Sequence, residues 1–240
     1  MNPAPDKAKQ ILESADIIAC TPLILGTNHK FLVNLDAGDG NIMPAIYKPK
    51  DGEKPLIDYP SETLYLREYA SYSLSQLLGW PDIPVTVIRN GPYGLGSMQC
   101  LVDFDPNINY FHLRDRRLKD LATFAVFDVL VNNGDRKGGH FLQDSSGNLW
   151  SIDHGLTFHH EPRLRSVMLE YGGLPFPRHL LKDVERVGTK LDVGGEMHEI
   201  LSQCINSREM DALMYRLQSI LNNPIYPTLY PHLDVPWPLI

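Results

Sequence analysis

Three side chains that can bind a metal or move protons lie within one short stretch of the sequence. Asp135 follows the cluster Asn-Asn-Gly at 132–134, His140 comes five residues later, and Asp153 stands directly before His-Gly. Carboxylate and imidazole groups are common carriers of general acid–base catalysis, and both bind divalent cations. The stretch 126–155 therefore has the residue types for acid–base or metal-assisted chemistry.

The elements around this stretch would hold the three side chains on a rigid frame. An apolar run at helical spacing over 121–131 leads into it, and the Asn-Asn-Gly cluster ends that helix. Two short strands, 141–143 and 149–152, then form a hairpin around the turn 144–148. We therefore expect a helix end and a hairpin to present the acids and the histidine together.

A second group of candidate residues lies earlier in the chain. Apolar runs at 23–25 and 31–35 flank a turn that contains Gly26, which predicts a β-hairpin. A third strand, 42–48, ends in Lys48 and is stopped by a proline. Taken alone, these features describe a plain hairpin and an exposed charge at a strand end.

A helix is predicted over 61–79, directly after the third strand and its loop. Gly79 would end this helix, and either Ser61 or Thr63 would cap its start. Glu68 lies among apolar neighbours at helical spacing, so its carboxylate is either at the edge of the buried face or paired with a cation.

The order of these features resembles the protein-kinase-like superfamily. Asp135, a polar residue five positions on, a hairpin and then Asp153-His-Gly resemble the catalytic loop and the metal-binding segment of that superfamily. The wording Asn-Gly-Asp-Arg at 133–136 is most similar to the phosphatidylinositol 3-/4-kinase, HipA-like and Fam20-like branches, which have D-R-H or similar where ordinary protein kinases have H-R-D. Over about residues 20–222 the chain resembles a bacterial phosphatidylinositol 3-/4-kinase-like family.

The resemblance implies an α+β, two-lobed protein-kinase-like fold. The N-lobe would be a five-stranded antiparallel sheet with the helix 61–79, and its last two strands are expected at 83–88 and 96–102. The C-lobe would be mostly helical. The implied ranges are 1–103 for the N-lobe, 104–240 for the C-lobe, 132–141 for the catalytic loop and 152–155 for the metal-binding segment.

The resemblance also implies phosphoryl transfer from ATP to a hydroxyl of a protein or small molecule. Asp135 would be the catalytic acid/base, Lys48 would contact the α- and β-phosphates while paired with Glu68, and Asp153 would bind Mg²⁺ or Mn²⁺. His140 stands where kinases have Asn, and its nitrogen suits Mn²⁺ better than Mg²⁺. It would contact a second metal ion, or hydrogen-bond Asp135, or leave the metal mainly to Asp153.

Other residues compete for these roles or would add to them. Lys50 and Glu62 are the alternatives to Lys48 and Glu68, but strand alternation places Lys48 with Ile46 on one face, and the helix dipole is enough to explain an acid at position 62. The basic residues Arg136 and Lys137 would offset phosphate charge. The remaining nucleotide-binding candidates are Gly26, Thr27 and Asn28 in the phosphate-covering turn, and Gln99 and Leu101 at the lobe connection.

Composition narrows the classes of partner. The 240 residues carry a net charge of −7, which argues against a general nucleic-acid binder. The three cysteines are far apart and form neither a disulfide framework nor a zinc pattern, so a cytoplasmic location is expected. No run reaches transmembrane length. The expected partners are therefore a nucleotide and a hydroxyl-bearing acceptor, without nucleic acid or an integral membrane segment.

The ends of the chain and the lobe boundary are expected to be less regular. Residues 1–10 look like a frayed polar leader, 103–115 like a polar linker before a helix at 117–131, and 223–240 like a proline-rich strap that Trp237 would anchor or that would stay disordered. The C-terminal helices are expected at 177–191, 195–204 and 207–221.

Three alternative functions use the same residues. A nucleotide-binding pseudokinase or regulatory module is favoured by the histidine at position 140, and transfer of AMP is compatible with the single glycine of the phosphate-covering turn. A metal-dependent hydrolase that uses the Asp/His set is a more distant alternative, because it would not need Lys48 or Glu68.

Overall fold

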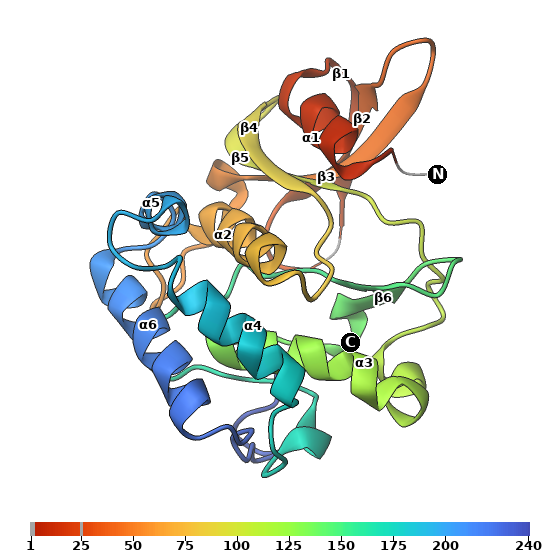
Figure 1. Ribbon diagram of the computed structural model, residues 1–240. Helices are drawn as coiled ribbons and strands as arrows, with labels where there is room; N and C mark the ends of the chain where they lie inside the picture. The colour runs from red at the N-terminus through yellow and green to blue at the C-terminus, as the bar shows by residue number, and fades with distance from the viewer. Residues whose placement is uncertain (1–2, 25) are drawn as a thin grey trace.

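The computed structural model describes residues 3–24 and 26–240, which form an α+β fold of two lobes. An antiparallel sheet makes up most of one lobe, and helices make up most of the other (Figure 1). The predicted fold class is therefore confirmed. Leu25, which was assigned to the first strand, and Met1 and Asn2, which were assigned to the leader, lie outside the described residues.

The sheet places β3 at its centre. Its strands are β1 (Ile17–Leu23), β2 (Lys30–Asp36), β3 (Ile42–Pro49), β4 (Thr86–Gly91) and β5 (Gly94–Cys100). Within the described residues they pair antiparallel in the order β1-β2-β3-β5-β4. Ala45 and Tyr47 of β3 are fully buried in the core of this lobe, whereas Ile46 and Lys48 point to the other face. The alternation expected for β3 is confirmed.

The N-terminal segment is a helix, not the frayed leader that we expected. Helix α1 (Pro5–Ser14) buries Ala8, Ile11 and Leu12 against the sheet. Their spacing of three and four residues is that of one helix face, and Pro5 is well placed in a first turn because that turn needs no N–H from it. The first strand consequently lies earlier in the sequence than the predicted 23–25.

Helix α2 (Leu64–Leu78) ends as predicted but begins differently. Gly79 adopts a left-handed conformation with φ of 84°, which only glycine accepts at little cost. Neither Ser61 nor Thr63 caps the start. Instead, the Glu53 carboxylate accepts hydrogen bonds from the Leu64 and Tyr65 N–H groups, at 3.0 and 2.8 Å. A distant side chain thus satisfies the free donors of the first turn.

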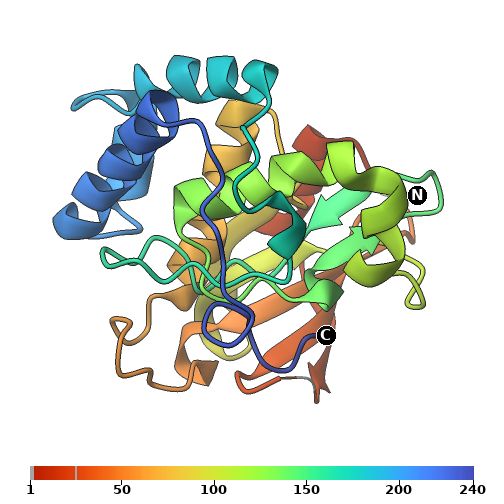
Figure 2. The ribbon, with the colours of Figure 1, turned by 90° about the horizontal axis from the view of Figure 1, so that it is seen from below.

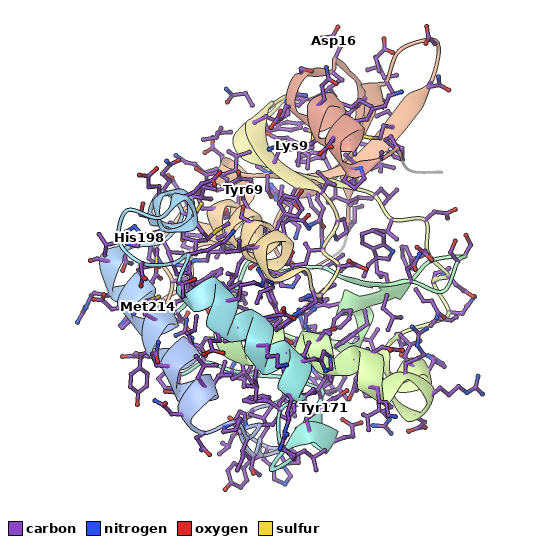
Figure 3. All side chains as sticks on the ribbon, in the orientation of Figure 1. Lys9, Asp16, Tyr69, Tyr171, His198 and Met214 are labelled. Atoms are coloured by element: carbon purple, nitrogen blue, oxygen red, sulfur yellow. The ribbon has the colours of Figure 1, made fainter. Side chains whose placement is uncertain are left out.

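The C-lobe contains α3 (Tyr110–Val131), α4 (Arg178–Gly188), α5 (Glu196–Ser202), α6 (Ser207–Asn222) and the hairpin of β6 (Phe141–Gln143) and β7 (Leu149–Ser151). Helix α3 begins inside the expected linker, because Asn109 caps it by accepting the Phe111 N–H, and the helix kinks at Arg117, where we expected it to start. Side chains fill the space between the helices (Figure 3), where the Tyr171 hydroxyl donates to the Leu118 carbonyl at 2.5 Å. Among the described helices, none combines the length and apolar character needed to cross a bilayer.

The C-terminal tail docks as an extended strap over the C-lobe (Figure 2). Tyr226 exchanges backbone hydrogen bonds with the segment 173–174, and the Gly138 N–H donates to the Leu239 carbonyl at 2.7 Å. The expectation that Trp237 anchors the strap is wrong, because its side chain is 85% exposed. The anchor is Tyr226, which is 4% exposed and packs against Phe176.

A fully buried ion pair joins helix α2 to the helical lobe. Arg67 Nη2 lies 2.5 Å from Glu209 Oε1 on α6, and Arg67 Nη1 donates to the Thr157 carbonyl at 2.6 Å. Ala70, Leu74 and Leu78 of α2 also belong to the core of the C-lobe. Helix α2 is therefore fixed to the C-lobe by both polar and apolar contacts.

We expect Arg67→Met to lower the free energy of unfolding by about 3–5 kcal/mol, because it leaves the buried Glu209 carboxylate without its partner. Urea unfolding measures the loss. The double variant Arg67→Met/Glu209→Gln should regain part of it, since Gln removes the uncompensated charge but can still accept the Asn206 N–H. Lys9→Met, which breaks an exposed pair, is the control. A double variant as unstable as the sum of both single variants would contradict this explanation.

Candidate active site

Lys48, Glu68 and Asp153 form a compact charged cluster at the junction of the lobes. The ammonium of Lys48, on β3, donates to Oε1 of Glu68, on α2. It also lies 3.0 Å from Oδ1 of Asp153, which follows β7. The predicted contact between Lys48 and Glu68 is therefore present. The competing residues Lys50 and Glu62 pair with each other at 2.8 Å on the surface.

The charges of this cluster control one another. Burial raises the pKa of Glu68, whereas the ammonium of Lys48 holds the pKa of Asp153 well below its usual range. Burial opposes the positive charge of Lys48, but the two carboxylates outweigh it and raise its pKa. Two carboxylates against one ammonium leave a negative charge that a divalent cation can offset.

The backbone at Asp153 is also held in place. Asp153 has a φ of 61°, a left-handed conformation that is uncommon for residues other than glycine but that Asp accepts better than most. Glu68 Oε2 accepts the His154 N–H at 3.1 Å, so one carboxylate fixes both the ammonium of Lys48 and the backbone beside Asp153.

The catalytic loop presents Asp135 beside a lysine. The Asp135 N–H donates to Asn133 Oδ1 at 3.0 Å, and its carboxylate lies 3.0 Å from the Lys137 ammonium. Burial raises the pKa of Asp135, and contact with Lys137 partly counters that shift. The charge of Asp153 also raises this pKa, so the two carboxylates lie close enough to interact.

Arg136 does not face the site, contrary to the expectation that it would offset phosphate charge. Its side chain is completely buried and forms two hydrogen bonds with the Asp128 carboxylate, at 2.8 and 2.9 Å. It also donates to the Ile152 carbonyl at 3.1 Å and lies 2.9 Å from His154 Nε2. Arg136 is thus a support beneath the loop, and Lys137 alone of the two basic residues lies beside Asp135.

His140 faces Asp153. Its Nε2 lies 3.5 Å from Asp153 Oδ2, its Nδ1 accepts the Lys137 N–H at 3.4 Å, and burial lowers its pKa to about 3, so the imidazole is neutral. The Asp135 carboxylate contacts Lys137 and not His140 in the described structure. Among all the residues that the structure describes, no group of three or more His, Cys, Asp or Glu side chains could hold a metal ion. The Asp153 carboxylate still fits a nucleotide-bound cation, because Mg²⁺ is usually bound by one or two carboxylates together with phosphates and water.

The remaining predicted nucleotide contacts lie along the sheet. Gly26 has a φ of 76°, Thr27 is exposed, and Asn28 Oδ1 accepts the Lys54 N–H at 2.9 Å. Gln99 donates from Nε2 to Thr86 Oγ1 at 2.8 Å, and the Leu101 N–H donates to the Pro44 carbonyl at 3.2 Å. Nucleotide binding by these five residues remains a prediction.

The sequence reasoning missed Lys30. A side chain added at Gly26 would meet the Lys30 ammonium at 3.6 Å, so this cation lies beside the phosphate-covering turn. Its charge also lowers the pKa of Asp153. The signal was available in the alternation of β2, where Phe31 and Val33 are buried and Lys30 lies on the other face.

Comparison with known proteins agrees with this geometry. A family model described as "Phosphatidylinositol 3- and 4-kinase" matches residues 88–222. Protein Rv2133c of Mycobacterium tuberculosis (strain ATCC 25618 / H37Rv) is 33% identical over 271 residues, which cover 97% of this chain and 95% of that protein.

Solved structures at low identity share the fold. A Golgi casein kinase with Mn/ADP bound has a TM-score of 0.58 at 14% identity, covering 91% of this chain and 74% of that chain. The structure of hydra Fam20 with sugar has a TM-score of 0.55 at 15% identity, and the match covers 90% of this chain and 86% of that chain. The Helicobacter pylori proinflammatory kinase CtkA has a TM-score of 0.52 at 11% identity, and the match covers 90% of this chain and 94% of that chain. The matching family model and the relative show that the chain belongs to the phosphatidylinositol 3- and 4-kinase family, and the solved structures show that it has a protein-kinase-like fold.

Proposed function

We propose that this protein is an ATP-dependent phosphotransferase that moves the γ-phosphate to a hydroxyl of a protein or small-molecule acceptor. The observation that carries the proposal is the contact of Lys48 with both Glu68 and Asp153, because it joins the sheet, α2 and the segment after β7 at one point. Phosphoryl transfer depends mainly on such positioning and on charge placed near the phosphates.

Each charged residue has a separate task in this proposal. Lys48, held by Glu68, binds the α- and β-phosphates, and Lys30 adds positive charge beside the phosphate-covering turn. Asp153 and the neutral His140 would hold Mg²⁺ or Mn²⁺, which supplies positive charge to the phosphates when bound. The Golgi casein kinase structure, which holds Mn/ADP, supports this use of nucleotide and metal.

Asp135 orients the acceptor hydroxyl and accepts its proton. Burial raises the pKa of its carboxyl group, and a carboxylate with a raised pKa is a better base. Contact with Lys137 lowers this pKa in part and fixes the direction of the carboxylate through their 3.0 Å contact. When ADP leaves, the Lys48 ammonium offsets the negative charge on its phosphates.

A second candidate function is nucleotide binding without transfer. It is favoured by His140, which occupies the place where kinases have Asn. The two functions differ in turnover and not in binding.

Thermal unfolding with ATP and either Mg²⁺ or Mn²⁺ tests the nucleotide site. At a ligand concentration of 100 Kd, binding stabilises the native state by about 2.7 kcal/mol, so the midpoint should rise. Lys48→Ala and Asp153→Ala should lose this rise and release no ADP. Lys50→Ala is the matched control, because Lys50 lies close to Lys48 in sequence but pairs with Glu62 on the surface.

The outcomes of this experiment are distinct. A rise in the midpoint without ADP release, under any condition with candidate acceptors, would favour the nucleotide-binding module. No rise with either metal ion would contradict a nucleotide-dependent function and leave a scaffold role for the same fold.

The pH dependence of turnover tests the role of Asp135. Protonation removes its ability to accept a proton, so turnover should fall as the pH is lowered through its raised pKa. Lys137→Met removes a contact that lowers this pKa, and the acid limb of the pH–rate profile should move to higher pH. Lys137→Arg should keep the wild-type limb. An unchanged limb in Lys137→Met would exclude Asp135 as the titrating group.

A further inference from the structure

Gln99 is a buried polar residue on the face of the sheet that carries Lys48. Between β3 and β5, Lys48 lies opposite Ser97 and Ile46 lies opposite Gln99, so these four side chains point to the same side. The opposite face is filled by the core that packs α1 against the sheet, which includes Met98. Only 7% of Gln99 is exposed, so its amide needs defined hydrogen-bond partners.

The amide of Gln99 is held in one orientation by β4. The Thr86 hydroxyl donates its single hydrogen to the Pro84 carbonyl at 2.8 Å, so its oxygen can only accept a bond from Gln99. Nε2 of Gln99 supplies that bond at 2.8 Å. A turned amide would require the Thr86 hydroxyl to leave the Pro84 carbonyl, and both residues are buried. Gln99 therefore directs Nε2 toward β4 and leaves Oε1 for another partner.

Oε1 of Gln99 is an accessible acceptor. Within residues 3–24 and 26–240 it accepts no hydrogen bond, and it is not one of the fully enclosed polar atoms that lack a partner there. Part of its surface is therefore open. Because the other face of the sheet is packed against α1, that open surface lies on the Lys48 side. An amide oxygen in such a place favours a ligand that donates a hydrogen bond, since a second acceptor would leave it unpaired.

The position of Gln99 along the sheet suits the base of a nucleotide whose phosphates contact Lys48. Gln99 lies two residues beyond Ser97, the cross-strand neighbour of Lys48, and it comes just before the chain leaves β5 for the C-lobe. Two residues of a strand span about 7 Å, so the two side chains can serve different parts of one nucleotide. Ile46, opposite Gln99, adds the apolar surface that ligand sites usually present to a flat ring.

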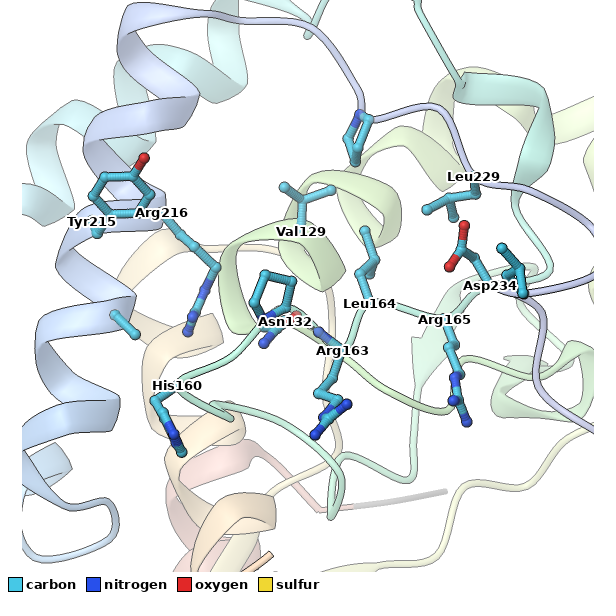
Figure 4. Close-up of a pocket in the computed structure, with 14 residues that line it drawn as sticks. Val129, Asn132, His160, Arg163, Leu164, Arg165, Tyr215, Arg216, Leu229 and Asp234 are labelled. Carbon is cyan, nitrogen blue, oxygen red and sulfur yellow. Dashed lines mark hydrogen bonds between the residues drawn. The ribbon is translucent and has the colours of Figure 1, made fainter. Parts of the chain in front are cut away.

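The pocket drawn in Figure 4 does not compete for this role. It has a volume of about 680 Å³ and lies in the C-lobe, where no residue of the five-stranded sheet lines it. Arg165 and Arg216 lie at opposite ends of its lining, with Asn132 and Arg163 between them, so their charges do not converge on one group of a ligand. The base is therefore assigned to the sheet.

We propose that Gln99 is a specificity-determining residue that selects a purine nucleotide with an amino group at position 6, an inference that rests on the proposed function. The 6-amino group of adenine is a donor, whereas guanine and hypoxanthine carry an acceptor oxygen at that position. Oε1 accepts from the adenine amino group, but it would face the oxygen of the other two bases without a hydrogen between them. Thr86 fixes the amide and is the positioning residue of this selection.

Calorimetric binding of ATP and ITP, each with Mg²⁺ and with Mn²⁺, tests the proposal, because ITP has a carbonyl in place of the amino group. The wild-type protein should bind ATP at least about tenfold more tightly, as expected when a buried acceptor loses its donor. Gln99→Met, which is similar in length, should lose most of this preference by binding ATP more weakly. Thr86→Val keeps the shape of the side chain but frees the amide to turn, so ITP should bind more tightly than to the wild-type protein. Thr21→Val, at an exposed position of β1, is the matched control and should keep the preference.

The outcomes separate this inference from the proposed function. Equal binding of ATP and ITP by the wild-type protein, or an unchanged preference in Gln99→Met, would overturn the role of Gln99 and leave nucleotide binding intact. An equal loss of ATP and ITP binding in Thr86→Val would overturn the positioning role of Thr86, since a purely structural residue affects both nucleotides alike. If neither nucleotide binds with either metal ion, the proposed function is contradicted and the selection by Gln99 falls with it.

Discussion

The buried ion pair of Asp128 and Arg136 holds together the segments on which the active site depends. It connects the last turns of α3 to the catalytic loop, and the same guanidinium reaches the Ile152 carbonyl and His154. Taking both charges out of water is costly, but the bidentate contact and the additional hydrogen bonds offset that cost. Asn133 also donates to the Asp128 carboxylate, at 2.9 Å. The loop is thus held around the Asp128 carboxylate, which accepts hydrogen bonds from both Asn133 and Arg136.

This buried centre explains the directions of the neighbouring side chains. Arg136 points inward, so Asp135 and Lys137 on either side of it are left to point outward, where they meet at 3.0 Å. The contact of Arg136 with Ile152 also fixes the start of the segment that carries Asp153. The two acids of the proposed reaction are therefore positioned by one arginine that contacts neither of them.

The parts of the site that follow local periodicity could be predicted from the sequence. Strand alternation placed Lys48 with Ile46 on the face opposite Tyr47, the helix dipole accounted for the acid at position 62, and the structure shows Lys48 in contact with Glu68. The hairpin before Asp153 follows from its turn residues. In each case a local feature of the sequence, and not a long-range contact, decides where the residue lies.

The parts that depend on long-range contacts could not be predicted in this way. Glu53 caps a helix that begins 11 residues later, which no local capping pattern describes. Arg136 looks like a solvated loop residue until the position of Asp128 below it is known. Trp237 stays exposed, whereas Tyr226 is buried against Phe176 and anchors the strap. Tertiary packing decided these positions.

The capping of α2 by Glu53 has a mechanical consequence. The two residues beside Glu53 hold the turn 26–29: the Gly52 carbonyl accepts the His29 N–H, and the Lys54 N–H donates to Asn28, both at 2.9 Å. The turn 26–29 and the start of helix α2 are thus both hydrogen-bonded to the segment 52–54. When the turn moves, it must either break these bonds or pull on the helix that carries Glu68. The segment 52–54 therefore couples the position of the turn 26–29 to that of helix α2.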